Sequence, residues 1–234
     1  MSRTTRELMS LSFSIDADRL RHAFRFVRTG EANTHPKFGD ALKRVLVEPH
    51  PKGGVYIVGC DGSIMVVQFD PAGSASAPFC IGLTDNERAQ LKGDEIRRRT
   101  LSLESEGDHL SLKTTGQRSS EFRTSDFKHG DSYPRWRDVL PKWSELRPGV
   151  PGQLNVHYLS MLVAMAGSSS IGDLPQRFDM YCAQSGINHQ KAAIIFFPNN
   201  PNMLAILMPM IGAVDEEPGE PAWLNPSFDP ADDL

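Results

Sequence analysis

The side chains able to do covalent chemistry form no recognisable catalytic pattern. The 234-residue chain has three cysteines, Cys60, Cys80 and Cys182, which lie far apart in the sequence. No Gly-x-Ser-x-Gly, His-Glu-x-x-His or phosphate-loop sequence occurs, and no Cys-x-x-Cys spacing suggests zinc. Asp61-Gly62 is typical of a turn, and His157 of a helix start. We therefore predict a non-enzymatic protein without metal or cofactor, with reduced cysteine thiols.

One segment has the chemistry of an apolar binding surface. The run AILMPM, Ala205–Met210, is the last strongly apolar stretch before the sequence becomes rich in acid and proline. Methionine side chains are flexible and form adaptable apolar surfaces, and an extended peptide can bury bulky side chains against such a surface. The alternative is ordinary core packing at the end of a strand.

A second group of residues has the chemistry of a phosphate-binding surface. Arg21, Arg25 and Arg28 recur at helical spacing, on a different face from an apolar stripe that includes Leu20 and Phe24. Contact with DNA phosphates requires only positive charge within reach. The alternative is a solvated helix face, which is the usual position of charge on a helix. A later predicted helix contributes Arg88 and Lys92.

The strands and helices that must position these residues are predicted to form three repeat units. Each unit has one strand, one helix and three further strands, in the order βαβββ. Strand and helix periodicities, together with Gly and Pro breaks, mark the units. The first has a strand at 12–15, a helix capped by Asp16 or Asp18 and stopped by Gly30, and strand-rich runs at 41–49, 55–62 and 63–71. The second has a strand at 79–83, a helix at 83–93 with the capping box Thr84–Glu87, and strands at 98–107, 108–116 and 119–127. The third follows a linker at 132–152, with a strand at 153–156, a helix at 157–167 and strands at 177–184, 191–198 and 203–210.

Charge is distributed unevenly along the chain. Seven of the 29 acidic residues and no basic residue lie from Asp215 onward, which leaves 22 acidic against 25 basic residues in the rest. This composition predicts that residues 212–234 form a disordered, acidic, Pro-rich tail. The tail nevertheless contains Trp223, Leu224 and Phe228. These side chains indicate either a partly docked tail or a segment that folds back into a groove and competes with partners.

No stretch of 18 apolar residues occurs, and the N-terminal segment MSRTTRELMSLSF lacks the apolar core of a signal peptide. We therefore predict a soluble, cytoplasmic protein without a membrane partner.

Four segments, in the same order, resemble the bacterial sliding clamp, the DNA polymerase III beta subunit family. Residues 46–67, LVEPHPKGGVYIVGCDGSIMVV, are similar to the clamp strand–turn–strand that ends in Ala-Thr-Asp-Gly-His-Arg-Leu. Residues 132–141, SYPRWRDVLP, are similar to Phe-Pro-Asp-Tyr-Arg-Arg-Val-Leu-Pro. LNVHYLSML at 154–162 and AILMPM are similar to Phe-Asn-Val-x-Tyr and Val-Met-Pro-Met-Arg-Leu.

The resemblance implies an α+β, DNA-clamp-like fold, with the repeat helices on one side of antiparallel sheets. Residues 12–141 would correspond to the middle clamp domain, built of two repeats. Residues 151–211 would correspond to the second half of the last domain, so that the chain resembles a truncated clamp of about one and a half domains. Residues 212–234 would remain as the tail.

The resemblance also implies a groove for a short linear peptide of DNA polymerase or of other clamp-binding proteins. Carried over position by position, its lining would be Leu42, Cys60, Gly62, Met65, Pro134, Val139, Asn155, Tyr158, Ile206, Met208, Pro209 and Met210. The His and Arg of the clamp motif are replaced by Ser63 and Ile64, an Arg by Asp138, and the Arg after Met-Pro-Met by Ile211. A less cationic groove should prefer a different peptide.

The implied function is that of a non-enzymatic processivity factor in DNA replication or repair. In clamps the repeat helices meet double-stranded DNA without reading its sequence, and here this would involve Arg21, Arg25, Arg28, Arg88 and Lys92. The alternative is a clamp-fold adaptor, decoy or inhibitor that binds protein partners without encircling DNA. The third repeat has no mate, which predicts a homodimer or a higher homo-oligomer.

Overall fold

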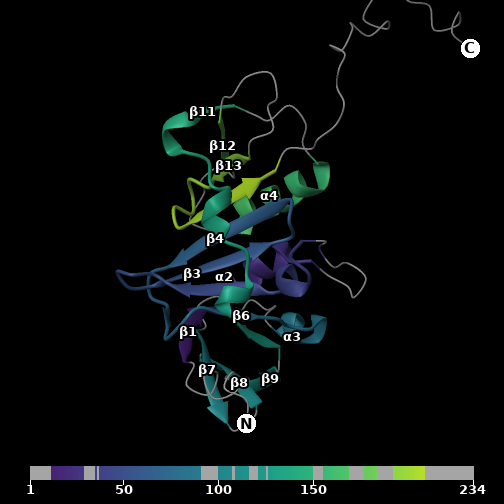
Figure 1. The fold of residues 1–234 in the computed structure, drawn as a ribbon, viewed down its shortest axis with the longest axis vertical. Helices are drawn as coiled ribbons and strands as arrows, with labels where there is room; N and C mark the ends of the chain where they lie inside the picture. The colour runs from purple at the N-terminus through teal and green to yellow at the C-terminus, as the bar shows by residue number, and fades with distance from the viewer. Residues whose placement is uncertain are drawn as a thin grey trace, which may run out of the picture.

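The fold is built from two antiparallel sheets, with helices packed on the larger one (Figure 1). The five-stranded sheet has the order β5-β1-β7-β8-β9, and the nine-stranded sheet has the order β10-β6-β2-β3-β4-β14-β13-β12-β11. The computed structural model describes residues 12–28, 35, 37–90, 100–106, 109–115, 121–124, 126–149, 155–168, 177–183 and 192–208.

The elements of the N-terminal part follow the expected β-α-β-β-β order twice. The first set is β1 (Phe13–Asp16), α2 (Ala17–Ala23), the 3-10 helices Phe24–Phe26 and Asp40–Lys43, β2 (Val45–Pro49), β3 (Val55–Cys60) and β4 (Ile64–Asp70). After β5 (Ser74–Ala75), the second set is β6 (Phe79–Ile81), α3 (Asp85–Gln90), β7 (Thr100–Glu106), β8 (His109–Thr115) and β9 (Glu121–Thr124), followed by β10 (Phe127–His129).

The C-terminal part continues the nine-stranded sheet. Its elements are the 3-10 helices Gly130–Ser132, Trp136–Val139 and Trp143–Glu145, then β11 (Leu146–Pro148), α4 (Val156–Ser168), β12 (Asp179–Ala183), β13 (Ala193–Phe196) and β14 (Met203–Leu207).

The first strand of each N-terminal set joins the sheet of the other set. β1 pairs with β7, with Phe13 opposite Leu103, whereas β6 pairs with β2, with Ile81 opposite Val45. This exchange ties the two sets into one structure. The α+β fold class predicted from the sequence is confirmed, while the predicted domain boundaries stay a prediction.

The junction between β4 and β14 connects the third set to the first. The two strands pair in antiparallel register from Met203 opposite Gln68 to Leu207 opposite Ile64. Because side chains alternate between the faces of a strand, Ile64 and Val66 enter the core on one face, and Met65 enters the core on the other. One continuous sheet therefore supports two separate apolar layers.

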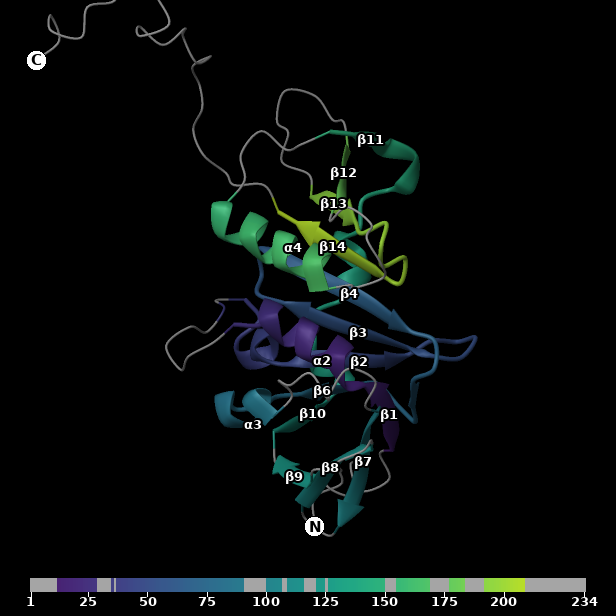
Figure 2. The same ribbon diagram turned by 180° about the vertical axis from the view of Figure 1, so that it is seen from behind.

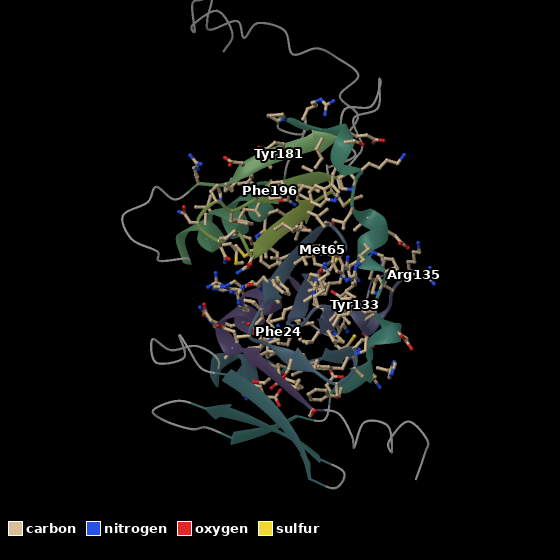
Figure 3. The ribbon with its side chains drawn as sticks, turned by 90° about the vertical axis from the view of Figure 1, so that its left-hand side faces the viewer. Phe24, Met65, Tyr133, Arg135, Tyr181 and Phe196 are labelled. Atoms are coloured by element: carbon tan, nitrogen blue, oxygen red, sulfur yellow. The ribbon has the colours of Figure 1, made fainter. Side chains whose placement is uncertain are left out.

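Helices α2 and α4 cover the same face of the nine-stranded sheet (Figure 2). Leu20 and Ala23 of α2 and Leu162 and Met165 of α4 are buried in the apolar layer on this face. α2 approaches β3 very closely, since a Cβ added to Gly59 would lie only 2.2 Å from the carbonyl oxygen of Ala23. The opposite face is covered by the 3-10 helices at 130–145 (Figure 3).

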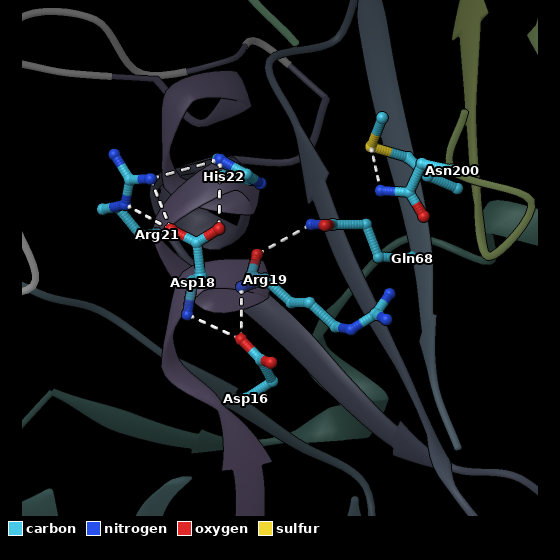
Figure 4. A network of polar contacts seen from close by, with 8 residues as sticks. Asp16, Asp18, Arg19, Arg21, His22, Gln68 and Asn200 are labelled. Carbon is cyan, nitrogen blue, oxygen red and sulfur yellow. Dashed lines mark hydrogen bonds and ion pairs between the residues drawn. The ribbon is translucent and has the colours of Figure 1, made fainter. Parts of the chain in front are cut away.

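Polar contacts fix α2 at its start and along its side (Figure 4). Asp16 is the N-cap, as expected, and its Oδ1 accepts hydrogen bonds from the backbone N–H groups of Asp18 and Arg19. The buried Gln68 of β4 donates from Nε2 to the carbonyl oxygen of Arg19 at 2.7 Å. The helix is thereby tied to β4 by a hydrogen bond as well as by apolar packing.

Two local expectations were wrong. The first helix was expected to run to Gly30, but it ends at Ala23 and continues only as the short 3-10 helix to Phe26, after which Val27 is extended. Val156 was expected in a strand, but it is the first residue of α4. The edge of β12 is instead covered by β11, where Arg147 lies opposite Cys182.

Candidate functional site

An apolar groove of about 430 Å³ lies on the face of the nine-stranded sheet opposite α2 and α4. We call it the apolar groove. Side chains from four parts of the sequence line it: residues 37–42 before β2, the β3–β4 turn, the segment after β10, and the end of β14. The lining residues are Lys37, Phe38, Leu42, Cys60, Gly62, Ser63, Ile64, Met65, Tyr133, Pro134, Arg135, Trp136, Asp138, Val139, Ile206 and Met208.

The floor of the apolar groove is formed at the β4–β14 junction. Met65 and Ile206 are partners in the register of the two strands, and both are almost fully buried. Beyond the last paired residue, the backbone N–H of Met208 donates to the carbonyl oxygen of Ser63 at 2.8 Å. The Met208 side chain is 42% exposed and is therefore available to a ligand at the mouth of the groove.

The wall opposite the floor is the 3-10 helix Trp136–Val139. Trp136 donates from Nε1 to Glu48 Oε2 at 3.0 Å, and Arg137 donates from Nη1 to Glu48 Oε1 at 2.8 Å. The Arg137 guanidinium also lies over the Trp136 ring, 4.1 Å from its centroid. These contacts fix the short helix against β2 and leave Val139 46% exposed at the groove.

The third side is the tight β3–β4 turn. Asp61 Oδ1 accepts hydrogen bonds from the backbone N–H groups of Ser63 and Ile64, and Gly62 has a φ of +100°. This φ is in the region that favours glycine, and a Cβ at Gly62 would also lie 2.8 Å from the His35 ring. The interpretation of Asp61-Gly62 as a turn is therefore confirmed.

Two ionisable groups at the groove, the partly buried Cys60 and the buried Tyr133, are held in their neutral forms. Burial raises the pKa of the Cys60 thiol to about 11, although the Gly62 N–H donates to its sulfur. Burial also raises the pKa of Tyr133 well above its usual value, and the Tyr133 hydroxyl donates to the Val58 carbonyl oxygen at 3.4 Å. Neither group therefore presents an anion or a strong nucleophile at the groove.

The structure brings most of the predicted groove residues together. Those at the apolar groove are Leu42, Cys60, Gly62, Met65, Pro134, Val139, Ile206 and Met208. Asn155 does not line it, because its side chain caps α4 by accepting from the His157 N–H at 2.9 Å. Tyr158 does not line it either and lies instead in a separate depression with Arg28 and Asp61. Pro209 and Met210 lie outside the described residues. The role of all these residues in peptide binding stays a prediction.

Several residues that line the apolar groove were not predicted from the sequence. Trp136 and Tyr133 lie in the same SYPRWRDVLP segment as the predicted Pro134 and Val139. Their aromatic side chains, next to residues already predicted to line the groove, could have identified them as lining residues. Lys37 and Phe38 come from a segment without any periodic pattern, and only the tertiary fold brings them to the groove.

A second depression, the polar hollow, lies on the helix side of the Asp61–Gly62 turn. It has a volume of about 390 Å³ and is lined by Arg25, Val27, Arg28, Asp61, His157, Tyr158 and Met161. Arg28 donates from Nε to the Asp61 carbonyl oxygen, which places its guanidinium beside the turn. Burial raises the pKa of the Tyr158 hydroxyl, which also hydrogen-bonds to the Ser63 side chain. With two arginines against one carboxylate, the polar hollow favours an anionic group.

The predicted DNA-contacting residues do not form one helix face. Arg25 and Arg28 meet at the polar hollow, whereas Arg21 pairs with Asp18 beside the buried His22 (Figure 4). Arg88 lies over the Phe24 ring, 5.0 Å from its centroid, and burial lowers its pKa. Lys92 lies outside the described residues. The early end of α2 explains the difference, because Arg28 leaves the helical spacing.

His22 is held neutral beside these arginines. The Arg21 guanidinium can only donate, so its contact of 3.3 Å with His22 Nε2 requires that nitrogen to be an acceptor. Burial lowers the pKa of His22 to about 4, although the nearby Asp18 opposes the shift. The contact of 3.6 Å between His22 and Asp18 is therefore not an ion pair near neutral pH.

Among the residues that the structure describes, no cluster of three or more His, Cys, Asp or Glu side chains could hold a metal ion. Over the same part of the chain, no helix is long and apolar enough to cross a membrane.

Solved structures with a similar fold are bacterial sliding clamps. The DNA polymerase III subunit beta from Borrelia burgdorferi, solved in complex with a natural product, matches with a TM-score of 0.56 and 9% identity, over 86% of this chain and 63% of that chain. The DNA polymerase sliding clamp from Pseudomonas aeruginosa matches with a TM-score of 0.51 and 14% identity, over 86% of this chain and 67% of that chain. No protein-family model and no curated protein matches the sequence.

The chain therefore has the sliding-clamp fold, and the resemblance drawn from its sequence motifs is confirmed at the level of the fold. It spans less than two thirds of the length of the Borrelia clamp.

Proposed function

We propose that this protein is a non-enzymatic, sliding-clamp-like binding protein of DNA replication or repair. Its apolar groove takes a short extended peptide from a DNA polymerase or another clamp-binding protein. The observation that carries the proposal is the β4–β14 junction, which unites Met65, Ile206 and Met208 with the wall at Val139. The buried floor and the half-exposed mouth are what an inserted apolar side chain needs.

The chemistry of the groove indicates the peptide it prefers. The lining has two cationic side chains, Lys37 and Arg135, and one anionic side chain, Asp138, around an otherwise largely apolar surface. Bulky aliphatic or aromatic side chains would fill the interior, and Met65 and Met208 would adapt to their shape. Ser63 and Ile64, in place of the His and Arg of the clamp motif, reduce the positive charge along the turn.

DNA contact is the second part of the proposal, and it is carried by the polar hollow. Arg25 is exposed there, and Arg28 and the α4 residues His157 and Tyr158 line the same hollow. A phosphate would meet two guanidinium groups and the His157 ring. Such a contact is independent of base sequence, and its affinity falls as the salt concentration rises.

The alternative is a clamp-fold adaptor, decoy or inhibitor that binds the same partner peptides and never encircles DNA. Both candidate functions use the apolar groove to bind peptides. They differ at the polar hollow, which binds DNA only in the first candidate. Self-association as a homodimer or higher homo-oligomer belongs to the first candidate, because the third repeat unit has no partner repeat among the described residues. Light scattering of the purified chain distinguishes a monomer from these assemblies.

The groove is tested with a library of labelled hexapeptides in which two bulky apolar side chains flank a polar residue. Val139→Asp places a charge at the groove, and we expect at least tenfold weaker binding of the selected peptide. Val163→Asp on α4 is the matched control, because Val163 is 54% exposed and lies outside the groove. Equal affinities of the two variants, or a library with no binder, would overturn the proposal.

A further inference from the structure

The C-terminal segment of the chain begins at the mouth of the apolar groove. Met208 lines the groove and is hydrogen-bonded to the β3–β4 turn, so that the following residues start beside the site. The next apolar cluster in the sequence, Trp223, Leu224 and Phe228, lies within the acidic stretch from Asp215 to Leu234. These three side chains have the size and apolar character that the groove accepts.

The distance along the chain allows the cluster to return to the groove. Roughly 15 residues separate Met208 from Trp223, and all residues after Met208 lie outside the described part of the chain. A flexible linker of that length would have an end-to-end distance of roughly 20 Å. A segment tethered in this way is present at its own site at an effective concentration of about 1 mM. Even a weak intrinsic interaction would then leave the groove mostly occupied.

Charge also favours binding of the acidic segment in the apolar groove. The lining of the apolar groove has one more cationic than anionic side chain, with Lys37 and Arg135 against Asp138. Arg135 is exposed, and Figure 3 shows it at the outer edge of the wall. The segment from Asp215 onward has seven acidic residues and no basic residue. Its acidic groups can therefore lie against the two cations while its apolar side chains enter the groove.

We infer that the segment Pro221–Leu234 binds in the apolar groove of its own chain and competes with partner peptides. The inference rests on the proposed function of the groove as a peptide site and adds its regulation. A partner peptide gains access only by displacing the segment. The apparent affinity of the peptide is therefore lowered by about the ratio of the segment's effective concentration to its intrinsic dissociation constant. With an intrinsic dissociation constant of about 0.1 mM, that factor is about tenfold.

The test uses the full chain with the triple substitution Trp223→Ala, Leu224→Ala and Phe228→Ala. The library-selected hexapeptide should bind this variant about tenfold more tightly than the native chain. The matched control, Asn225→Ala with Ser227→Ala, changes the same segment without removing its large apolar side chains and should bind as the native chain does. Equal affinity of the triple variant and the native chain would overturn the inference and leave the peptide groove in place.

A second measurement needs no partner peptide. The methyl resonances of Met65 and Met208, recorded with 13C-methyl methionine, should differ between the native chain and the triple variant, because the bound segment covers both side chains. Identical resonances would overturn the inference. A difference that disappears on dilution would show that the segment reaches the groove of a second copy, which contradicts binding within one chain. If no hexapeptide binds either chain, the proposed function fails, while this measurement still reports separately on the segment.

Discussion

Met65 of β4 and Ile206 of β14 face each other as register partners, and both side chains reach the floor of the same groove. They are separated by most of the sequence, yet the pairing of β4 with β14 makes them neighbours. Each belongs to the apolar layer on the face of the sheet opposite α2 and α4. The candidate binding site is therefore a property of the strand junction and not of either segment alone.

The wall of the groove depends on Glu48. Replacing Glu48 with alanine removes the acceptor of the Trp136 and Arg137 hydrogen bonds, and we expect a loss of about 1–2 kcal/mol in the free energy of unfolding. Peptide binding should weaken as the 3-10 helix becomes free to move. Urea unfolding and peptide titration measure the two effects. Asp131→Ala, at an exposed carboxylate outside the apolar groove, is the control and should change neither.

DNA binding should depend on Arg25. Arg25→Ala should weaken binding of a short duplex at low salt and reduce the slope of log affinity against log salt by about 1. Lys52→Ala removes the same charge from the exposed β2–β3 turn and should leave the slope unchanged. A similar loss in both variants would contradict DNA contact at the polar hollow. Absence of any binding by the native chain at low salt would favour the adaptor.

Stability should fall in mild acid because of His22. Burial lowers its pKa from 6.5 in the unfolded chain to about 4 in the folded chain. The unfolded state therefore takes up the proton first as the pH falls below 6.5, and the folded state loses roughly 3 kcal/mol by pH 4. Well above pH 6.5 both states are neutral at this residue, and it contributes no pH dependence.

His22→Gln should remove that part of the pH dependence, as measured by urea unfolding at a series of pH values between 4 and 7. His129→Gln, at the exposed end of β10, is the control and should retain the pH dependence of the native chain. An unchanged pH profile in His22→Gln would show that other groups account for the loss of stability.

The close approach of α2 to β3 should not tolerate a side chain at Gly59. In Gly59→Ala the new Cβ would overlap the Ala23 carbonyl oxygen, at 2.2 Å, and we expect a loss of roughly 3 kcal/mol from the forced separation of helix and sheet. Gly149→Ala meets nothing within 4 Å and should stay within about 0.5 kcal/mol of the native chain. Thermal unfolding of both variants provides the comparison. Equal stabilities would mean that α2 can shift at little cost.

Local chemistry was enough to predict several elements of the fold. Asp16 caps α2, and Thr84 and Glu87 form the expected capping box, because both motifs act within a few residues. The Asp61–Gly62 turn was predictable for the same reason. The end of α2 was not, because the switch to an extended backbone at Val27 accompanies burial of Phe26 and Val27, which no local signal encodes.

By itself, the sequence determined the repeated β-α-β-β-β order of the N-terminal elements, the caps of α2 and α3, the Asp61–Gly62 turn, and the apolar character of the last strand. These follow from side-chain periodicity and from hydrogen bonds within a few residues. The tertiary structure alone decided that β14 pairs with β4, that Lys37 and Phe38 reach the apolar groove, and that Arg25 and Arg28 meet at the polar hollow while Arg21 and Arg88 do not. Those outcomes depend on strand pairing and burial between distant segments, which a local pattern does not specify.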